Sequence, residues 1–233
     1  RIVEITGLTN LYPITSSKYY EWYPVFSPDG AKIVFQGWQQ SKGSNNLNNS
    51  ICIMDIDGSN IRQIVNDEYN NFSPQFSADS RLIMFQSIRK DTNMDGLINT
   101  KDNSGIYIID IDKREEKQLV LDRYYNYNPQ FSPDNKFVIF QSIRNAANMD
   151  GLVNTKDNSG IYIVDIDKIL SQHEDKREEK QLSSDKYYNF NPQISPNSRL
   201  IVFQSVRRDT NSDGVFNSKD KAGVYIVDSR GIE

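Results

Sequence analysis

Two loops of the chain share one spacing of carboxylate and amide side chains. One runs from Asp91 to Asp102 and reads DTNMDGLINTKD, and the other runs from Asp209 to Asp220 and reads DTNSDGVFNSKD. Both fit the pattern D-x-N-x-D-G-x-x-N-x-x-D. A hard cation such as Ca²⁺ takes roughly six to eight oxygen ligands, and alternate residues of such a loop can direct oxygen atoms inward. The spacing therefore predicts calcium binding.

These loops resemble the calcium loops of EF-hand proteins, and most closely those of dockerins, which also end in Asp. The resemblance implies side-chain oxygens at the first, third, fifth, ninth and last places, a backbone carbonyl at the seventh, and a sharp turn at the glycine. The implied ligands are Asp91, Asn93, Asp95, Leu97, Asn99 and Asp102 in one loop, and Asp209, Asn211, Asp213, Val215, Asn217 and Asp220 in the other. The alternative is a metal-free polar hairpin, because Asp and Asn favour turns in any case.

A third loop has the same pattern without its leading carboxylate, because Ala146 stands in that place. The remaining candidate ligands are Asn148, Asp150, Leu152, Asn154 and Asp157. We therefore expect two strong calcium sites and one weaker site. Calcium loops of weak to moderate affinity suit calcium concentrations outside the cytoplasm, which favours a periplasmic or extracellular protein.

Internal repetition indicates which elements position these loops. A Phe-Gln pair recurs at Phe35, Phe85, Phe140 and Phe203, and each pair ends a run rich in β-forming residues. The repeats span about 18–65, 66–120, 121–183 and 184–233, after a partial unit over 1–15. Each reads as short antiparallel strands separated by turns, and a calcium-type loop joins the second strand to the third in the last three. This arrangement predicts an all-β protein, a single β-propeller domain of four-stranded blades over 1–233.

The repeat also resembles a known family. The first repeat carries Phe26-Ser27-Pro28-Asp29-Gly30, and the other three carry relatives of this segment. Together with the later Ile-Tyr-Ile-x-Asp strands, the pattern is similar to the TolB-like, or PD40, class of WD40-related repeats. The resemblance implies a propeller with a binding or gating role, and it does not identify the partner.

Closure of the ring is ambiguous in the sequence. Residues 1–15 align with the third and fourth strands of a preceding blade, whereas the last repeat supplies a first, second and third strand. Joining the two ends gives five strands where a blade needs four. Either the first six residues are surplus or the chain is a segment of a larger propeller, and we favour the segment.

Aromatic side chains precede or begin the first strand of several repeats. Because strands alternate in direction, these side chains should lie on the same face of the propeller as the calcium-type loops. Clustered aromatic residues are common anchors of protein interfaces and sugar sites. The predicted partner-binding residues are Tyr20, Trp22, Tyr125 and Tyr188. The alternative is that such side chains pack between neighbouring blades.

The composition and charge of the chain exclude several classes of function. The chain carries 27 Lys and Arg against 31 Asp and Glu, which argues against a nucleic-acid partner, and no stretch is apolar enough to span a membrane. Cys52 lies in an apolar run and should be a buried thiol. His173, the sole histidine, lies in a charged insert over 168–180 and offers no triad or zinc site.

We therefore predict a protein that is not an enzyme, a calcium-binding propeller that binds a protein or, as a further option, a glycan. One alternative is the accessory propeller domain of a larger peptidase or glycan-acting enzyme. Another is a propeller that is itself a metal-assisted hydrolase, which requires an open coordination position in a central pocket.

Overall fold

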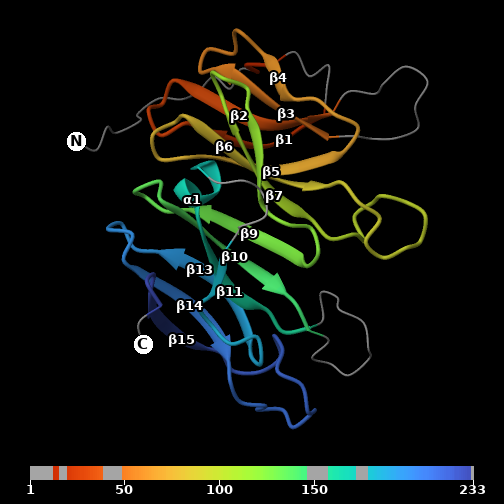
Figure 1. Cartoon of the computed structure of the whole chain (residues 1–233), viewed down its shortest axis with the longest axis vertical. Coiled ribbons are helices and arrows are strands. Elements are labelled where there is room, and N and C mark those ends of the chain that lie inside the picture. The colour runs from red at the N-terminus through yellow and green to blue at the C-terminus, as the bar shows by residue number, and fades with distance from the viewer. Residues whose placement is uncertain (1–12, 16–19, 39–48, 146–156, 172–177, 232–233) are drawn as a thin grey trace.

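Four antiparallel β-sheets follow one another along the chain and stack side by side as the blades of a propeller (Figure 1). The computed structural model describes residues 13–15, 20–38, 49–145, 157–171 and 178–231. Three sheets have four strands, and the last has three. The predicted all-β propeller architecture is therefore confirmed.

We number the blades in chain order. Blade 1 comprises β1 (Tyr20–Phe26), β2 (Lys32–Trp38), β3 (Asn49–Asp55) and β4 (Arg62–Val65). Blade 2 comprises β5 (Asn70–Phe76), β6 (Leu82–Ile88), β7 (Gly105–Asp110) and β8 (Glu116–Val120). Blade 3 comprises β9 (Tyr125–Phe131), β10 (Phe137–Ile143), β11 (Gly160–Asp165) and β12 (Glu179–Gln181). Blade 4 comprises β13 (Tyr188–Ile194), β14 (Leu200–Val206) and β15 (Gly223–Asp228).

The same serine-led turn joins the first and second strands of every blade. In blade 1 the Ser27 amide donates to the Lys32 carbonyl at 2.9 Å, and the Gly30 amide donates to the Ser27 carbonyl at the same distance. Gly30 has a φ of 72°, in the left-handed region that glycine adopts without strain. The serine-led turn recurs at Ser77, Ser132 and Ser195, so the Ser-Pro-Asp-Gly signal and its relatives fix where each hairpin folds back.

The apolar core lies between blades. A cluster formed by blades 1 and 2 includes Ile51 and Ile53 from one sheet and Ile83, Phe85 and Ile109 from the next. An equivalent cluster between blades 2 and 3 contains Met84, Ile106, Ile108, Val138, Phe140 and Tyr162. Both faces of an inner blade are therefore buried, which explains why its second and third strands are almost continuously apolar.

Three buried asparagines tie each blade to the one before it, and we call Asn71, Asn126 and Asn189 the junction asparagines. The Asn126 amide group donates to the carbonyls of Ser104 in blade 2, at 3.0 Å, and of Leu121 and Tyr124 in the connection between the blades, at 2.9 and 3.0 Å. Asn189 repeats this set with Ser159, Ser184 and Tyr187. A single amide thus satisfies three backbone carbonyls that the blade junction would otherwise bury unpaired.

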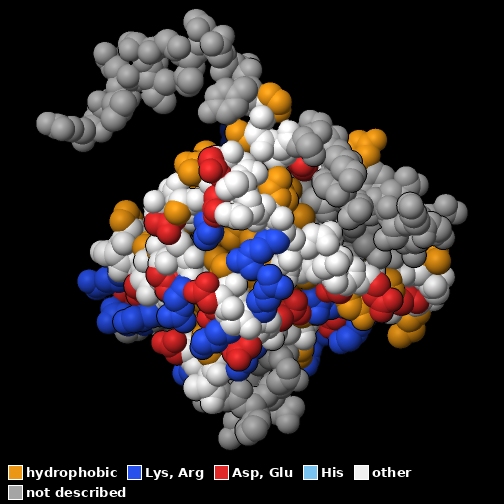
Figure 2. Space-filling model, turned by 90° about the horizontal axis from the view of Figure 1, so that it is seen from above, with side chains coloured by type: hydrophobic (Ala, Val, Ile, Leu, Met, Phe, Trp, Pro, Cys, Tyr) orange, Lys and Arg blue, Asp and Glu red, His pale blue; other side chains and the backbone are white. Residues whose placement is uncertain are grey.

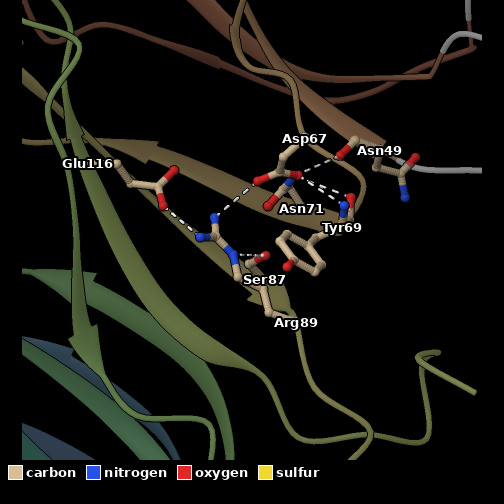
Figure 3. A network of polar contacts seen from close by, with 7 residues as sticks. All are labelled: Asn49, Asp67, Tyr69, Asn71, Ser87, Arg89 and Glu116. Carbon is tan, nitrogen blue, oxygen red and sulfur yellow. Dashed lines mark hydrogen bonds and ion pairs between the residues drawn. The ribbon is translucent and has the colours of Figure 1, made fainter. Parts of the chain in front are cut away.

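Arg89, directly after β6, contributes to the Asn71 junction between blades 1 and 2. Arg89 donates to Glu116 at 2.7 Å, to Asp67 at 3.2 Å and to Ser87 at 2.9 Å, and Asp67 also accepts from the Asn71 amide at 2.7 Å (Figure 3). The Arg89 guanidinium also stacks over the Tyr107 ring, 3.9 Å from its centroid. Equivalent stacked arginines follow β10 and β14, at Arg144 and Arg207.

The charged insert over 168–180 contributes to the core as well as to the surface. It begins with a short helix, α1 (Ile166–Ser171), whose Ile166 and Ile169 side chains are buried in the cluster of blades 2 and 3. The apolar spacing of three residues on one helical face accounts for this packing. His173 lies outside the described residues.

Replacing a junction asparagine should weaken the blade stack. Asn126→Ala leaves three buried carbonyls without their donor, and we expect the free energy of unfolding to fall by roughly 2–4 kcal/mol. Chemical denaturation at fixed calcium measures this loss. The control is Gln193→Ala, which removes an exposed side chain whose one hydrogen bond among the described residues is to the adjacent Pro192 carbonyl, and it should change stability by less than about 0.5 kcal/mol. Equal losses in the two variants would contradict the role of the amide.

Candidate metal-binding site

The loop between β6 and β7 is held by its own carboxylates. Asp91 accepts the backbone amides of Asp95 and Gly96, at 3.1 and 2.8 Å. Asp102 accepts those of Thr92, Asn93 and Asn99, at 2.7, 3.1 and 2.9 Å. The first and last predicted ligands are therefore the organising residues of the loop.

The loop between β14 and β15 repeats this scheme. Asp209 accepts the amides of Asp213 and Gly214, at 3.2 and 2.7 Å. Asp220 accepts those of Thr210, Asn211 and Asn217, at 2.7, 3.2 and 3.2 Å. Two loops that share only part of their sequence thus fold to one hydrogen-bond scheme, because the Asp, Asn and Gly positions are the same in both.

Glycine at the sixth place is required by the backbone. Gly96 and Gly214 have φ values of 85° and 83°. Nothing lies within 4 Å of a Cβ built on either glycine, so the constraint is conformational rather than steric crowding. The sharp turn predicted from the loop pattern is present in both loops.

The structure brings three carboxylates of the second loop together. Ligand oxygens of Asp209, Asp213 and Asp220 all lie within 4.8 Å of one another. Two oxygens bound to one Ca²⁺ are at most about 5 Å apart, twice the usual calcium–oxygen distance. The donor set is made of hard oxygen atoms, and its spacing fits a calcium ion.

The closing aspartates are buried although the loops are exposed. Asp102 and Asp220 are 1% and 8% exposed. Burial raises the pKa of the Asp102 carboxyl, but hydrogen bonds from the Asn99, Asn93 and Thr92 amides outweigh burial and hold that pKa below its usual value. The pKa of Asp220 is lowered for the same reasons. Both carboxylates therefore stay charged at neutral pH.

The third loop is described only at its end. Asn148, Asp150, Leu152 and Asn154 lie outside the described residues. Asp157, the closing residue of that loop, is 1% exposed, like Asp102. The burial of this position is therefore shared by all three loops.

The stacked arginine and the junction asparagine fix the two ends of the β6–β7 loop. The loop begins two residues after Arg89 and ends two residues before Ser104, whose carbonyl and hydroxyl both bond the Asn126 segment. The sequence analysis did not single out the arginines. Their recurrence two residues after each Phe-Gln-Ser triplet was the signal that could have found them.

One aromatic side chain that precedes a first strand, Tyr187, lies beside a calcium-type loop. The Phe216 ring of the β14–β15 loop makes an edge contact with Tyr187, 5.7 Å between centroids. Tyr20 and Trp22 are 61% and 57% exposed. Tyr125 and Tyr188 are half-buried and contact Tyr127 and Phe190 in their own strands.

A hollow of about 360 Å³ lies where blades 1 to 3 meet. Its lining includes Tyr23, Gln36, Asp102, Tyr125 and Tyr127. The closing aspartate of one loop and one predicted partner-binding residue of the neighbouring blade, Tyr125, are thus part of one surface.

The single cysteine of the chain, Cys52, has a structural role. Cys52 is buried, and burial together with the nearby Glu21 carboxylate raises its pKa to about 11. It is therefore not a nucleophile at neutral pH, which confirms the prediction of a core cysteine.

No protein-family model matches the sequence, and no curated protein does. Solved structures match the fold. TolB from Acinetobacter baumannii is 20% identical, with a TM-score of 0.53 over 93% of this chain and 43% of that one. The β-propeller domain of the trilobed protease from Pyrococcus furiosus is 15% identical, with a TM-score of 0.57 over 89% of this chain and 54% of that one.

An oligogalacturonate lyase in complex with manganese is 12% identical, with a TM-score of 0.54 over 89% of this chain and 48% of that one. The chain therefore has the TolB-like β-propeller fold and spans about half of each of these structures. Among the described residues, none belongs to a helix long and apolar enough to cross a lipid bilayer.

Acid should remove the contribution of the closing aspartate. Because the folded-state pKa of Asp102 is lowered, its charged form stabilises the fold above the unfolded-state pKa of about 3.9, and this contribution is lost as the pH falls through the folded-state value. In chelator, Asp102→Asn should lower the melting temperature at neutral pH, and the difference from wild type should shrink below about pH 4.

Thermal melts at a series of pH values, monitored by circular dichroism, measure this difference. The control is Asp112→Asn in the exposed turn after β7. A difference for Asp102→Asn that stays constant down to the lowest pH would show that its charge is not what stabilises the loop.

Proposed function

We propose that the chain is a calcium-binding β-propeller module that acts outside the cytoplasm by binding a partner, without catalysis. The observation that supports calcium most directly is the common hydrogen-bond scheme of the two loops, with three carboxylates of one loop gathered within 4.8 Å. Bound calcium would supply positive charge that offsets the repulsion between these carboxylates.

The residues that would hold the ion are those of the loop pattern. Asp91, Asn93, Asp95, Asn99 and Asp102 offer side-chain oxygens, and Leu97 offers its carbonyl. In the other loop the same places belong to Asp209, Asn211, Asp213, Asn217, Asp220 and Val215. Asp102 and Asp220 already bond three backbone amides each, so they link the ion to the fold of the loop.

The role of calcium in this proposal is to order a binding face. The β6–β7 loop ends at the Asn126 junction, and the β14–β15 loop contacts Tyr187. Ordering these loops therefore positions the segments around Tyr125 and Tyr187. Tyr20 and Trp22 lie in β1 of blade 1, where they are exposed. Large aromatic side chains that stay exposed are typical anchors for a protein partner, with a glycan as the other option.

The surface supports a protein partner rather than a polyanion. Figure 2 shows one face on which Lys and Arg side chains are interspersed with Asp and Glu side chains and with apolar groups. Nucleic-acid binding needs a concentrated basic surface. The formal charge of −4 points the same way.

A second candidate is the accessory propeller domain of a larger peptidase or glycan-acting enzyme. The observation that favours it is the fold shared with a protease propeller domain and with an oligogalacturonate lyase, each of which this chain only partly spans. In both candidates the chain itself is a binding module, and they differ in what it is joined to.

The chain alone should therefore show no turnover of peptide or oligogalacturonide substrates, with calcium or with manganese present. Release of amine or of unsaturated product at a rate above that of buffer measures turnover. Turnover that Asp95→Ala with Asp213→Ala removes would instead establish metal-assisted catalysis on the propeller.

Calcium should raise the thermal stability of the chelated protein. At free calcium about 100-fold above the dissociation constant, each filled site contributes about 2.7 kcal/mol, which corresponds to a rise of roughly 5–10 °C in melting temperature. The double variant Asp95→Ala, Asp213→Ala should lose the rise, because it lacks one ligand in each loop. Differential scanning calorimetry with titrated calcium measures both.

The two single variants show which loop forms which calcium site. Calorimetric titration of Asp95→Ala and of Asp213→Ala should each show one strong site fewer than wild type. The control is Asp57→Ala, which removes a carboxylate from an exposed turn of blade 1 that bonds only Ser59 among the described residues. An unchanged melting temperature in wild type would show that the loops are metal-free polar hairpins.

A further inference from the structure

The hollow where blades 1 to 3 meet contains a buried polar atom that the described part of the chain does not satisfy. Gln36 lines this hollow and is 7% exposed. Its side-chain oxygen, Oε1, is buried and accepts no hydrogen bond from any described residue. A buried acceptor without a donor lowers stability, so each such atom in a folded protein calls for a physical explanation.

The equivalent glutamines of blades 3 and 4 show which donor is missing. Gln141 and Gln204 stand in the same Phe-Gln pair, and their Oε1 atoms accept from the side-chain amides of Asn128 and Asn191, at 2.9 and 3.0 Å. Both asparagines lie where the register of the first strand shifts. In blade 1 this place belongs to Tyr23, which supplies no such donor to Gln36.

The backbone at this place also favours asparagine over tyrosine. Tyr23, Asn128 and Asn191 have φ values of 52°, 49° and 51°, in the left-handed region. Asparagine adopts this region readily, whereas a bulky residue is strained there. Blade 1 therefore keeps a strained tyrosine where an asparagine would relax the backbone and satisfy Gln36. Residues that break local rules in this way are concentrated at ligand sites.

The lining of the hollow fits a small neutral ligand. Its rings are those of Tyr23, Phe72, Tyr125 and Tyr127, and side-chain amides and hydroxyls lie among them. Among the described lining residues, Asp102 alone is charged at neutral pH, and three backbone amides already bond its carboxylate. An anion would find no Lys or Arg in this lining. The volume of about 360 Å³ is at the small end of ligand pockets.

We propose that this hollow binds one neutral sugar unit of a saccharide. A sugar hydroxyl donates to Gln36 Oε1, and the apolar C–H face of the same sugar ring packs on the aromatic side chains. An apolar side chain of a protein partner could fill the space but would leave Gln36 unsatisfied. The inference rests on the proposed function, in which the chain is a binding module, and it assigns the glycan option to one surface.

Saturation-transfer NMR of the full chain in calcium tests the site. The probes are the methyl glycosides of glucose, galactose, mannose and N-acetylglucosamine, and we expect saturable binding of at least one. Gln36→Leu removes the acceptor and should weaken that binding by at least about tenfold. The control is Gln204→Leu, at the same place in blade 4 and outside the described lining, which should leave binding unchanged. Equal binding by wild type and Gln36→Leu would overturn the proposal.

Tyr23→Asn separates a binding role from a structural one. The new amide should donate to Gln36, as Asn128 donates to Gln141, and it should relax the backbone. We therefore expect the melting temperature to rise by roughly 2–4 °C while saccharide binding falls by at least about tenfold. A lower melting temperature would show that the tyrosine is kept for packing, and that result or unchanged binding would overturn the proposal.

Two further measurements separate this inference from the proposed calcium module. Methyl glucuronide, which adds a carboxylate, should bind at least about tenfold more weakly than methyl glucoside, because the described lining offers no cation. A calcium-dependent rise in melting temperature without binding of any probe would overturn this inference alone and leave the hollow to a protein side chain. Saccharide binding by a chain that shows no response to calcium would support the site and contradict the calcium proposal.

Discussion

The structure depends on one buried amide group at each blade junction. A propeller must bring the end of one sheet and the start of the next together inside the molecule, where backbone carbonyls have no water to bond. The Asn126 side chain meets this constraint with three donated hydrogen bonds, to Ser104, Leu121 and Tyr124. An apolar residue at that position would leave the carbonyls unpaired. An ionised carboxylate would also leave them unpaired, because it has no hydrogen to donate to a carbonyl oxygen.

The candidate metal loops take their position from this junction. The β6–β7 loop starts beside Arg89, which stacks on Tyr107 and pairs with Glu116, and it ends at Asp102 beside the Asn126 junction. Its exposed middle is free to carry the proposed ligands because its flanks are fixed by Arg89 and Asn126, which are not among those ligands. Proteins hold metal sites most accurately when the ligands project from such a supported frame.

Much of this arrangement can be predicted from sequence, for physical reasons. Some residue types fix the local backbone conformation. They are the turn serines, the glycines at positive φ and the Phe-Gln pairs at strand ends, and where these residues repeat, the structure repeats. The sharp turn predicted at Gly96 is confirmed by its positive φ, because loop geometry is set by the local backbone. The ligand roles of Asp102 and Asp220 stay a prediction.

Other features depend on distant contacts and could not be predicted in this way. Ile169 lay in the insert over 168–180 that was predicted from its charges, yet it packs with Ile166 on the core of two blades through α1. The stacking of Arg89 on Tyr107 joins residues of different strands, and single residues in one sequence do not reveal that pairing.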